Sequence, residues 1–125
     1  MVRRLTLAFA VLFAFVVVSG YVPTFYTVEG GERVQWGLFR LTLLDDITHG
    51  VTALAALLAG ATSRKLSLLF LTAFGFYYAL DAVFFLTYGL FNEKPWIDDV
   101  LLNLPHVLIS AAMLWIVYRV APVRD

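Results

Sequence analysis

Two histidines and one aspartate are the residues of this sequence best suited to chemistry, because each interrupts a long apolar stretch. His49 lies about eight residues into one stretch, His106 about nine residues into another, and Asp81 about nine residues before the end of a third. A helix rises about 1.5 Å per residue, so all three would lie roughly 12–14 Å below the same end of their helices. Two imidazoles and one carboxylate can bind zinc or non-haem iron. We therefore predict a divalent-metal site formed by His49, Asp81 and His106.

Three further polar residues are expected to support this site. Asp46 lies three residues before His49, Asn103 three before His106, and Asp99 seven before His106, which places each on the same helix face as the histidine. A carboxylate or amide that hydrogen-bonds an imidazole fixes its orientation. Asp46, Asp99 and Asn103 are therefore predicted to complete a polar cluster.

The same residues fit other roles, which the sequence leaves open. The polar side chains could hydrogen-bond between helices and hold them in register. Two histidines on facing helices could be the axial ligands of a b-type haem. A proton or cation relay is a further alternative, although few polar groups continue the cluster to the opposite side. Ser110, His106 and Asp81 have the residue types of a hydrolytic triad, but no nucleophile motif accompanies them, so an enzyme is not favoured.

Composition identifies the environment of these residues. The chain has 125 residues, of which 62% are hydrophobic, 16% aromatic and 14% charged. Soluble domains are about 45–50% apolar and about 25% charged, so this composition indicates a membrane protein and excludes a disordered tail or a soluble enzyme. The formal net charge of zero leaves no basic surface for nucleic acid. Cysteine is absent, which excludes disulfides and thiolate metal sites.

Four apolar segments are long enough to cross a membrane, since about 20 residues span its hydrocarbon core. We predict spans at residues 5–22, 41–61, 66–90 and 97–118 of one domain, residues 1–125. The expected fold is an all-α integral membrane four-helix bundle with up-down topology. Residues 1–20 also have the basic start and small-residue end of a cleavable signal peptide, but we interpret them as part of the first span.

Basic residues predict the orientation of the bundle. Six of them would lie on one side of four spans, and the positive-inside rule makes that side, with both termini, cytoplasmic. These are Arg3, Arg4, Arg64, Lys65, Arg119 and Arg124. The polar cluster would then lie near the extracytoplasmic side of the inner membrane. On that side, residues 23–40 should turn at Gly30-Gly31, and residues 35–40 should lie along the membrane surface. The expected partners are lipid and either a second copy or a larger membrane complex, in which the chain would be an accessory subunit.

A repeated motif suggests that the two halves of the chain are related. Asp46-x-x-His49 in the second span matches Asn103-x-x-His106 in the fourth, so two helical hairpins form a predicted parallel internal repeat. Other recognisable features are Gly37-Leu38-Phe39, Ser63-Arg64, Gly75-Phe76-Tyr77-Tyr78 and Asp98-Asp99. Together these resemble a family of small four-span bacterial membrane proteins of unknown function with Asn/Asp-x-x-His on both even-numbered spans. The resemblance covers roughly residues 37–115; it implies the fold and no activity.

Overall fold

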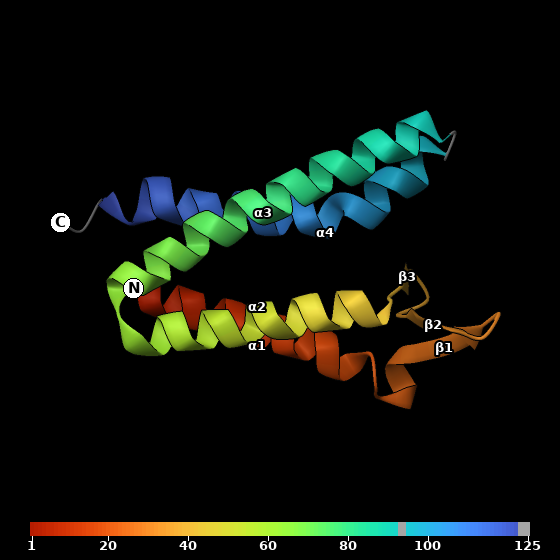
Figure 1. Cartoon of the computed structure of the whole chain (residues 1–125), viewed down its shortest axis with the longest axis horizontal. Coiled ribbons are helices and arrows are strands. Elements are labelled where there is room, and N and C mark those ends of the chain that lie inside the picture. The colour runs from red at the N-terminus through yellow and green to blue at the C-terminus, as the bar shows by residue number, and fades with distance from the viewer. Residues whose placement is uncertain (93–94, 123–125) are drawn as a thin grey trace. The chain divides into compact units, whose positions relative to one another are not determined.

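The computed structural model describes residues 1–92 and 95–122, and 79% of the chain is helical. Its four long helices are shown in Figure 1: α1 (Val2–Ser19), α2 (Leu43–Thr62), α3 (Arg64–Phe91) and α4 (Trp96–Trp115), which the short π-helix η2 (Ile116–Val120) continues. All four are long and apolar enough to cross a membrane. The predicted all-α class is therefore confirmed, together with four helices that are long and apolar enough to span a membrane. Up-down topology, orientation and the internal repeat stay predictions.

The chain divides into two compact units. The first comprises Met1 and Arg3–Arg64, and it contains most of α1, all of α2 and a small β-sheet between them. The second comprises Val2 and Lys65–Asp125, with all of α3 except Arg64, and with α4 and η2. Within each unit the two long helices run antiparallel (Figure 1). Arg124, one of the basic residues used to predict the orientation, lies outside the described residues.

The helix ends differ from the predicted spans by a few residues, for local reasons. α1 ends at Ser19, three residues before the predicted boundary, because Pro23 starts a 3₁₀ turn, η1 (Pro23–Phe25), and holds Val22 in an extended conformation. α2 begins after Thr42, whose hydroxyl accepts a hydrogen bond from the backbone N–H of Asp45 at 3.3 Å. The Asp45 carboxylate accepts from the Thr42 N–H at 2.7 Å, which completes a capping box.

The segment between α1 and α2 folds into an antiparallel sheet that the sequence analysis did not predict. Its strands are β1 (Tyr26–Glu29), β2 (Glu32–Gln35) and β3 (Phe39–Arg40), in the order β1-β2-β3. Residues 35–40 therefore form the end of β2, a turn and β3.

Two tight turns connect these strands. The predicted turn at Gly30-Gly31 is present, with φ values of 60° and 85°. The second turn contains Trp36 at φ 54° and Gly37 at φ 68°, and the Leu38 N–H bonds the Gln35 carbonyl at 3.1 Å. Positive φ at both central residues matches the twist of a hairpin, and it is unusual at a tryptophan.

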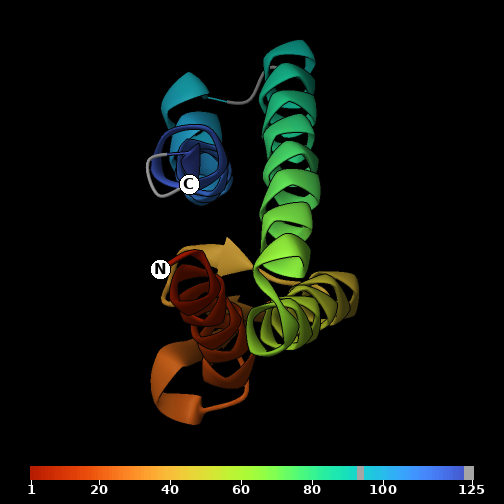
Figure 2. The same cartoon turned by 90° about the vertical axis from the view of Figure 1, so that its left-hand side faces the viewer.

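Close helix packing within each unit depends on glycine. A Cβ added at Gly60 of α2 would lie 2.8 Å from Cγ of Leu7 in α1, and one added at Gly75 of α3 would lie 2.9 Å from Cδ2 of Leu114 in α4. Small residues allow membrane helices to approach in this way. Ala56, one turn before Gly60, is fully buried. Figure 2 shows the same helices after a 90° turn, with the two helices of each pair side by side.

Candidate functional site

The second unit brings together two of the three residues predicted to bind a metal. Nδ1 of His106 in α4 lies 2.9 Å from Oδ2 of Asp81 in α3, within ion-pair distance but outside the geometry of a hydrogen bond. The two side chains are 26% and 22% exposed. Tyr78, on the same face of α3 as Asp81, is buried, and its ring centroid lies 5.5 Å from that of His106.

The orientation of this pair distinguishes the two nitrogens of His106. Nδ1 faces the carboxylate, so Nε2, on the other side of the ring, is the nitrogen turned away from Asp81. A carboxylate next to one imidazole nitrogen favours the tautomer that carries its proton there and leaves a lone pair on the other. Asp81 therefore lies beside Nδ1 of His106, and Nε2 is the nitrogen placed to meet a metal ion.

Asp99 and Asn103 contact each other in α4. The Asn103 side-chain amide donates to the Asp99 backbone carbonyl at 2.8 Å and to its carboxylate at 3.3 Å. Both side chains are buried, 4% and 7% exposed. The Asp99 carboxylate packs directly over Gly89 of α3, where any Cβ would overlap it. Asp99 thus packs against α3, and Asn103 bonds it within α4.

Asp46 of α2 contacts residues outside the predicted cluster. Its Oδ2 accepts hydrogen bonds from Arg33 of β2 at 2.8 Å and from the Tyr21 hydroxyl at 2.7 Å, and the side chain is 5% exposed. Arg33 also donates to the carbonyl of Gly20, after the end of α1, and its guanidinium lies 4.1 Å from the centroid of the Tyr21 ring. The Asp46 carboxylate raises the pKa of Arg33 above its ordinary value. Arg33 thus joins α1, α2 and the sheet.

Gln35 is a second residue of this junction that the sequence analysis missed. It is 2% exposed, and its amide nitrogen donates to the Val16 carbonyl at 2.9 Å and to the Ser19 hydroxyl at 2.6 Å. The junction formed by Tyr21, Arg33, Gln35 and Asp46 is called the sheet junction below. The sequence gives little indication of this junction. Arg33 is a single basic residue in a short polar segment, and its spacing from Asp46 does not predict that the two side chains pair.

His49 belongs to the first unit, whereas Asp81 and His106 belong to the second. Its ring stacks on that of Phe13 in α1, with centroids 6.0 Å apart. Among residues 1–92 and 95–122, no three His, Cys, Asp or Glu side chains form a group that could hold a metal ion. The three-residue site, and a haem ligated by both histidines, stay predictions.

Ser110, the nucleophile of the hydrolytic alternative, has its hydroxyl bonded to the Val107 carbonyl at 2.9 Å. Such a bond to the preceding turn is common for serine in a helix. The bond therefore gives no support to Ser110 as a nucleophile.

Comparisons with protein-family models, with curated proteins and with solved structures find no match to this chain.

Proposed function

We propose that this chain is a multi-pass protein of the inner membrane, with both termini cytoplasmic, and that His106 and Asp81 form a cation-binding site. The cation is a divalent metal such as Zn²⁺ or Fe²⁺. The observation that carries the proposal is the 2.9 Å separation of Nδ1 and Oδ2. It supports a histidine oriented by a carboxylate, with Nε2 as the ligand atom, and such carboxylate–histidine pairs are typical of metal sites.

The cost of placing these groups in a membrane helix supports a role beyond packing. An aspartate at a helix centre costs about 2.5–3.5 kcal/mol on insertion scales, so such residues commonly mark functional sites. Both side chains are about a quarter exposed, which leaves room for a ligand to approach. We also propose that the chain is related to the four-span family of unknown function that it resembles, and that the lipid bilayer is its partner.

A structural role is the second candidate, and it is favoured for three other residues of the predicted cluster. Asp46 is bonded to Arg33 and Tyr21, while Asp99 and Asn103 are bonded to each other. We propose that Asp46 joins α2 to the sheet, that Asp99 packs α4 against α3 with Asn103 bonding it within α4, and that none of the three takes part in cation binding. Bonds between membrane helices average about 0.6 kcal/mol, enough to favour one arrangement.

The test is the metal content and visible spectrum of protein purified in mild detergent. We expect near-stoichiometric zinc or iron, lost in His106→Gln and reduced in Asp81→Asn. Asn103→Ala, whose side chain bonds within α4, is the matched control and should retain the metal. His49→Gln tests the third ligand that the sequence predicts: loss of metal would add His49 to the site, and unchanged metal content would leave Asp81 and His106 as its ligands.

The outcomes separate the alternatives. A Soret band that disappears in His106→Gln would show that the bound group is haem and not a divalent metal ion. Metal-free protein that binds no added Zn²⁺ would refute the cation site. If His106→Gln and Asp81→Asn were then also less stable than the wild type, the pair would have the same structural role as Asp99 and Asn103.

A further inference from the structure

Four aromatic rings gather where the turn between β2 and β3 meets α1. The Phe15 ring of α1 stacks on Trp36 at a centroid distance of 6.2 Å and meets Phe25 edge-on at 6.3 Å, and Trp36 meets Phe39 edge-on at 6.1 Å. These rings do not form a closed core, since Phe15, Phe25 and Trp36 are 51%, 39% and 41% exposed. Leu38, in the same turn, is 64% exposed. A contiguous exposed apolar surface of this kind marks a contact with a membrane or a protein.

The position of Phe15 along α1 gives the depth of this aromatic cluster. Phe15 lies four residues before the end of α1, which is about 6 Å of helix. Gln35, the neighbour of Trp36, bonds the carbonyl of Val16, one residue further along α1. The turn therefore lies beside the last turns of an apolar helix that is long enough to span a membrane, and not beyond its end.

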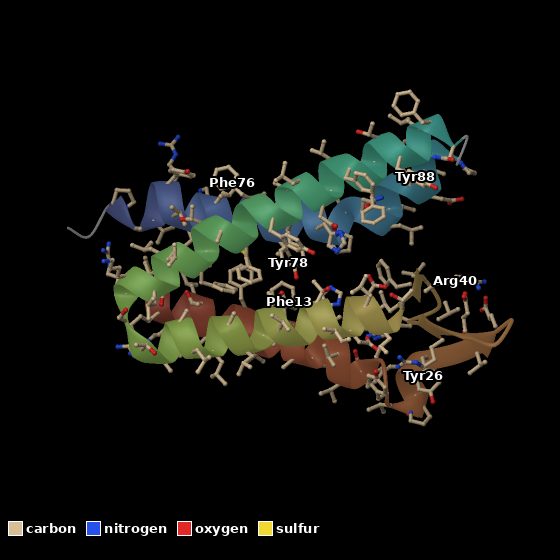
Figure 3. The ribbon with its side chains drawn as sticks, viewed as in Figure 1. Phe13, Tyr26, Arg40, Phe76, Tyr78 and Tyr88 are labelled. Carbon is tan, nitrogen blue, oxygen red and sulfur yellow. The ribbon has the colours of Figure 1, made fainter. Side chains whose placement is uncertain are left out.

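The opposite end of the sheet is charged. Arg40 pairs with Glu29 at 3.3 Å and with Glu32 at 3.2 Å next to the Gly30-Gly31 turn, and all three charged side chains are more than half exposed. Figure 3 shows Arg40 beyond the ends of α1 and α2. Apolar and charged groups are thus separated along the sheet in the direction in which α1 runs.

We propose that the turn Trp36-Gly37-Leu38 is inserted into the lipid interface beside the outer end of α1, with the bilayer itself as its partner. The charged Gly30-Gly31 end then stays in water. Tryptophan is enriched at this depth because its ring is apolar while its N–H can bond headgroups or water. The strained backbone of Trp36 is held by a 2.7 Å bond from its N–H to the Phe25 carbonyl, which keeps its ring on Phe15. This proposal does not depend on the cation site.

Tryptophan fluorescence in phosphatidylcholine vesicles tests the depth directly. Replacing the other two tryptophans, as W96F and W115F, leaves Trp36 as the only tryptophan, and both replaced side chains are more than half exposed. We expect strong quenching by lipids brominated near the headgroup, weaker quenching by lipids brominated near the chain end, and little quenching by iodide. The control is V28W in the background W36F/W96F/W115F, because Val28 is 64% exposed on β1 near the charged end.

The two reporters should behave in opposite ways. The V28W emission should be quenched several-fold more by iodide than that of Trp36 and should not respond to brominated lipid. If Trp36 instead matched the V28W reporter with both quenchers, the turn would lie in water and the proposal would be wrong. Quenching of Trp36 mainly by bromine near the chain end would also overturn it, since the turn would then lie in the hydrocarbon core.

Discussion

Replacing Arg33 by methionine tests whether the sheet junction stabilises the first unit. The change keeps much of the aliphatic chain and removes the guanidinium, so the Asp46 carboxylate loses its bond from Arg33 and keeps that from the Tyr21 hydroxyl. The bond to the Gly20 carbonyl and the contact with the Tyr21 ring are lost as well. Arg40→Met is the matched control, because Arg40 also pairs with carboxylates in the same sheet.

Burial decides the size of the two effects. Asp46 is 5% exposed and Arg33 is 29% exposed, and a hydrogen bond to a charged group in such a place contributes about 1.5–3 kcal/mol. The cation–π contact adds about 0.5–1 kcal/mol. We therefore expect R33M to lower the free energy of unfolding by about 2–4 kcal/mol. Arg40 and its partners are more than half exposed, so R40M should cost less than about 1 kcal/mol.

The assay is an SDS titration of the W96F/W115F protein in dodecylmaltoside micelles, followed by the emission of Trp36. This tryptophan directly follows β2 and reports loss of the stacked contact with Phe15. The R33M penalty should not change between about pH 6 and about pH 9. The pKa of Arg33 is raised in the folded protein, so its contribution is complete below the unfolded pKa and is lost only in more alkaline solution.

Equal destabilisation by R33M and R40M would refute this reasoning, because burial would then have no influence. A penalty below about 1 kcal/mol for R33M would show that the ion pair behaves like an exposed one. Coupling between Arg33 and Asp46 can be isolated with D46N and the double variant, and the two effects should be clearly non-additive.

Two further variants test helix packing and capping. Gly89→Ala places a methyl group against the Asp99 carboxylate and should destabilise the second unit by about 1–3 kcal/mol, whereas Gly50→Ala, with open space around it, should be neutral or slightly stabilising; thermal unfolding in detergent compares them. Arg3→Met removes two hydrogen bonds to the last carbonyls of α2 and should cost about 1–2 kcal/mol in the same assay, and an equal loss in Arg4→Met would show that the effect is one of charge alone.

The four helices could be predicted from the sequence because their apolar stretches exceed the length that a membrane requires. The sheet could not, since its strands have only two to four residues and one of its turns places Trp36 at a positive φ. The apolar stretch that predicts the first span also runs through Tyr21 and Val22, so it did not indicate that α1 ends at Ser19. Local turn chemistry at Pro23 decided that boundary.

The candidate site was predictable to the extent that it depends on helical periodicity. Equal depth in two helices brought Asp81 and His106 together. Spacing along one helix could not identify the partner of Asp46, because Arg33 lies 13 residues away in the sequence and reaches it only through the fold of the sheet. Spacing relates residues of one helix, whereas contacts between elements depend on how those elements pack.

The contacts of the first unit bear on how the chain is made. Arg3 donates hydrogen bonds to the carbonyls of Gly60 and Ala61, and Arg33 pairs with Asp46. Every partner named for these two arginines therefore lies within the first 64 residues. Synthesis proceeds from the N-terminus, and domains generally fold as units in that order. Once Arg64 has left the ribosome, α1, the sheet and α2 have all their own contacts available. The first helix pair can therefore close before synthesis of the second helix pair is complete.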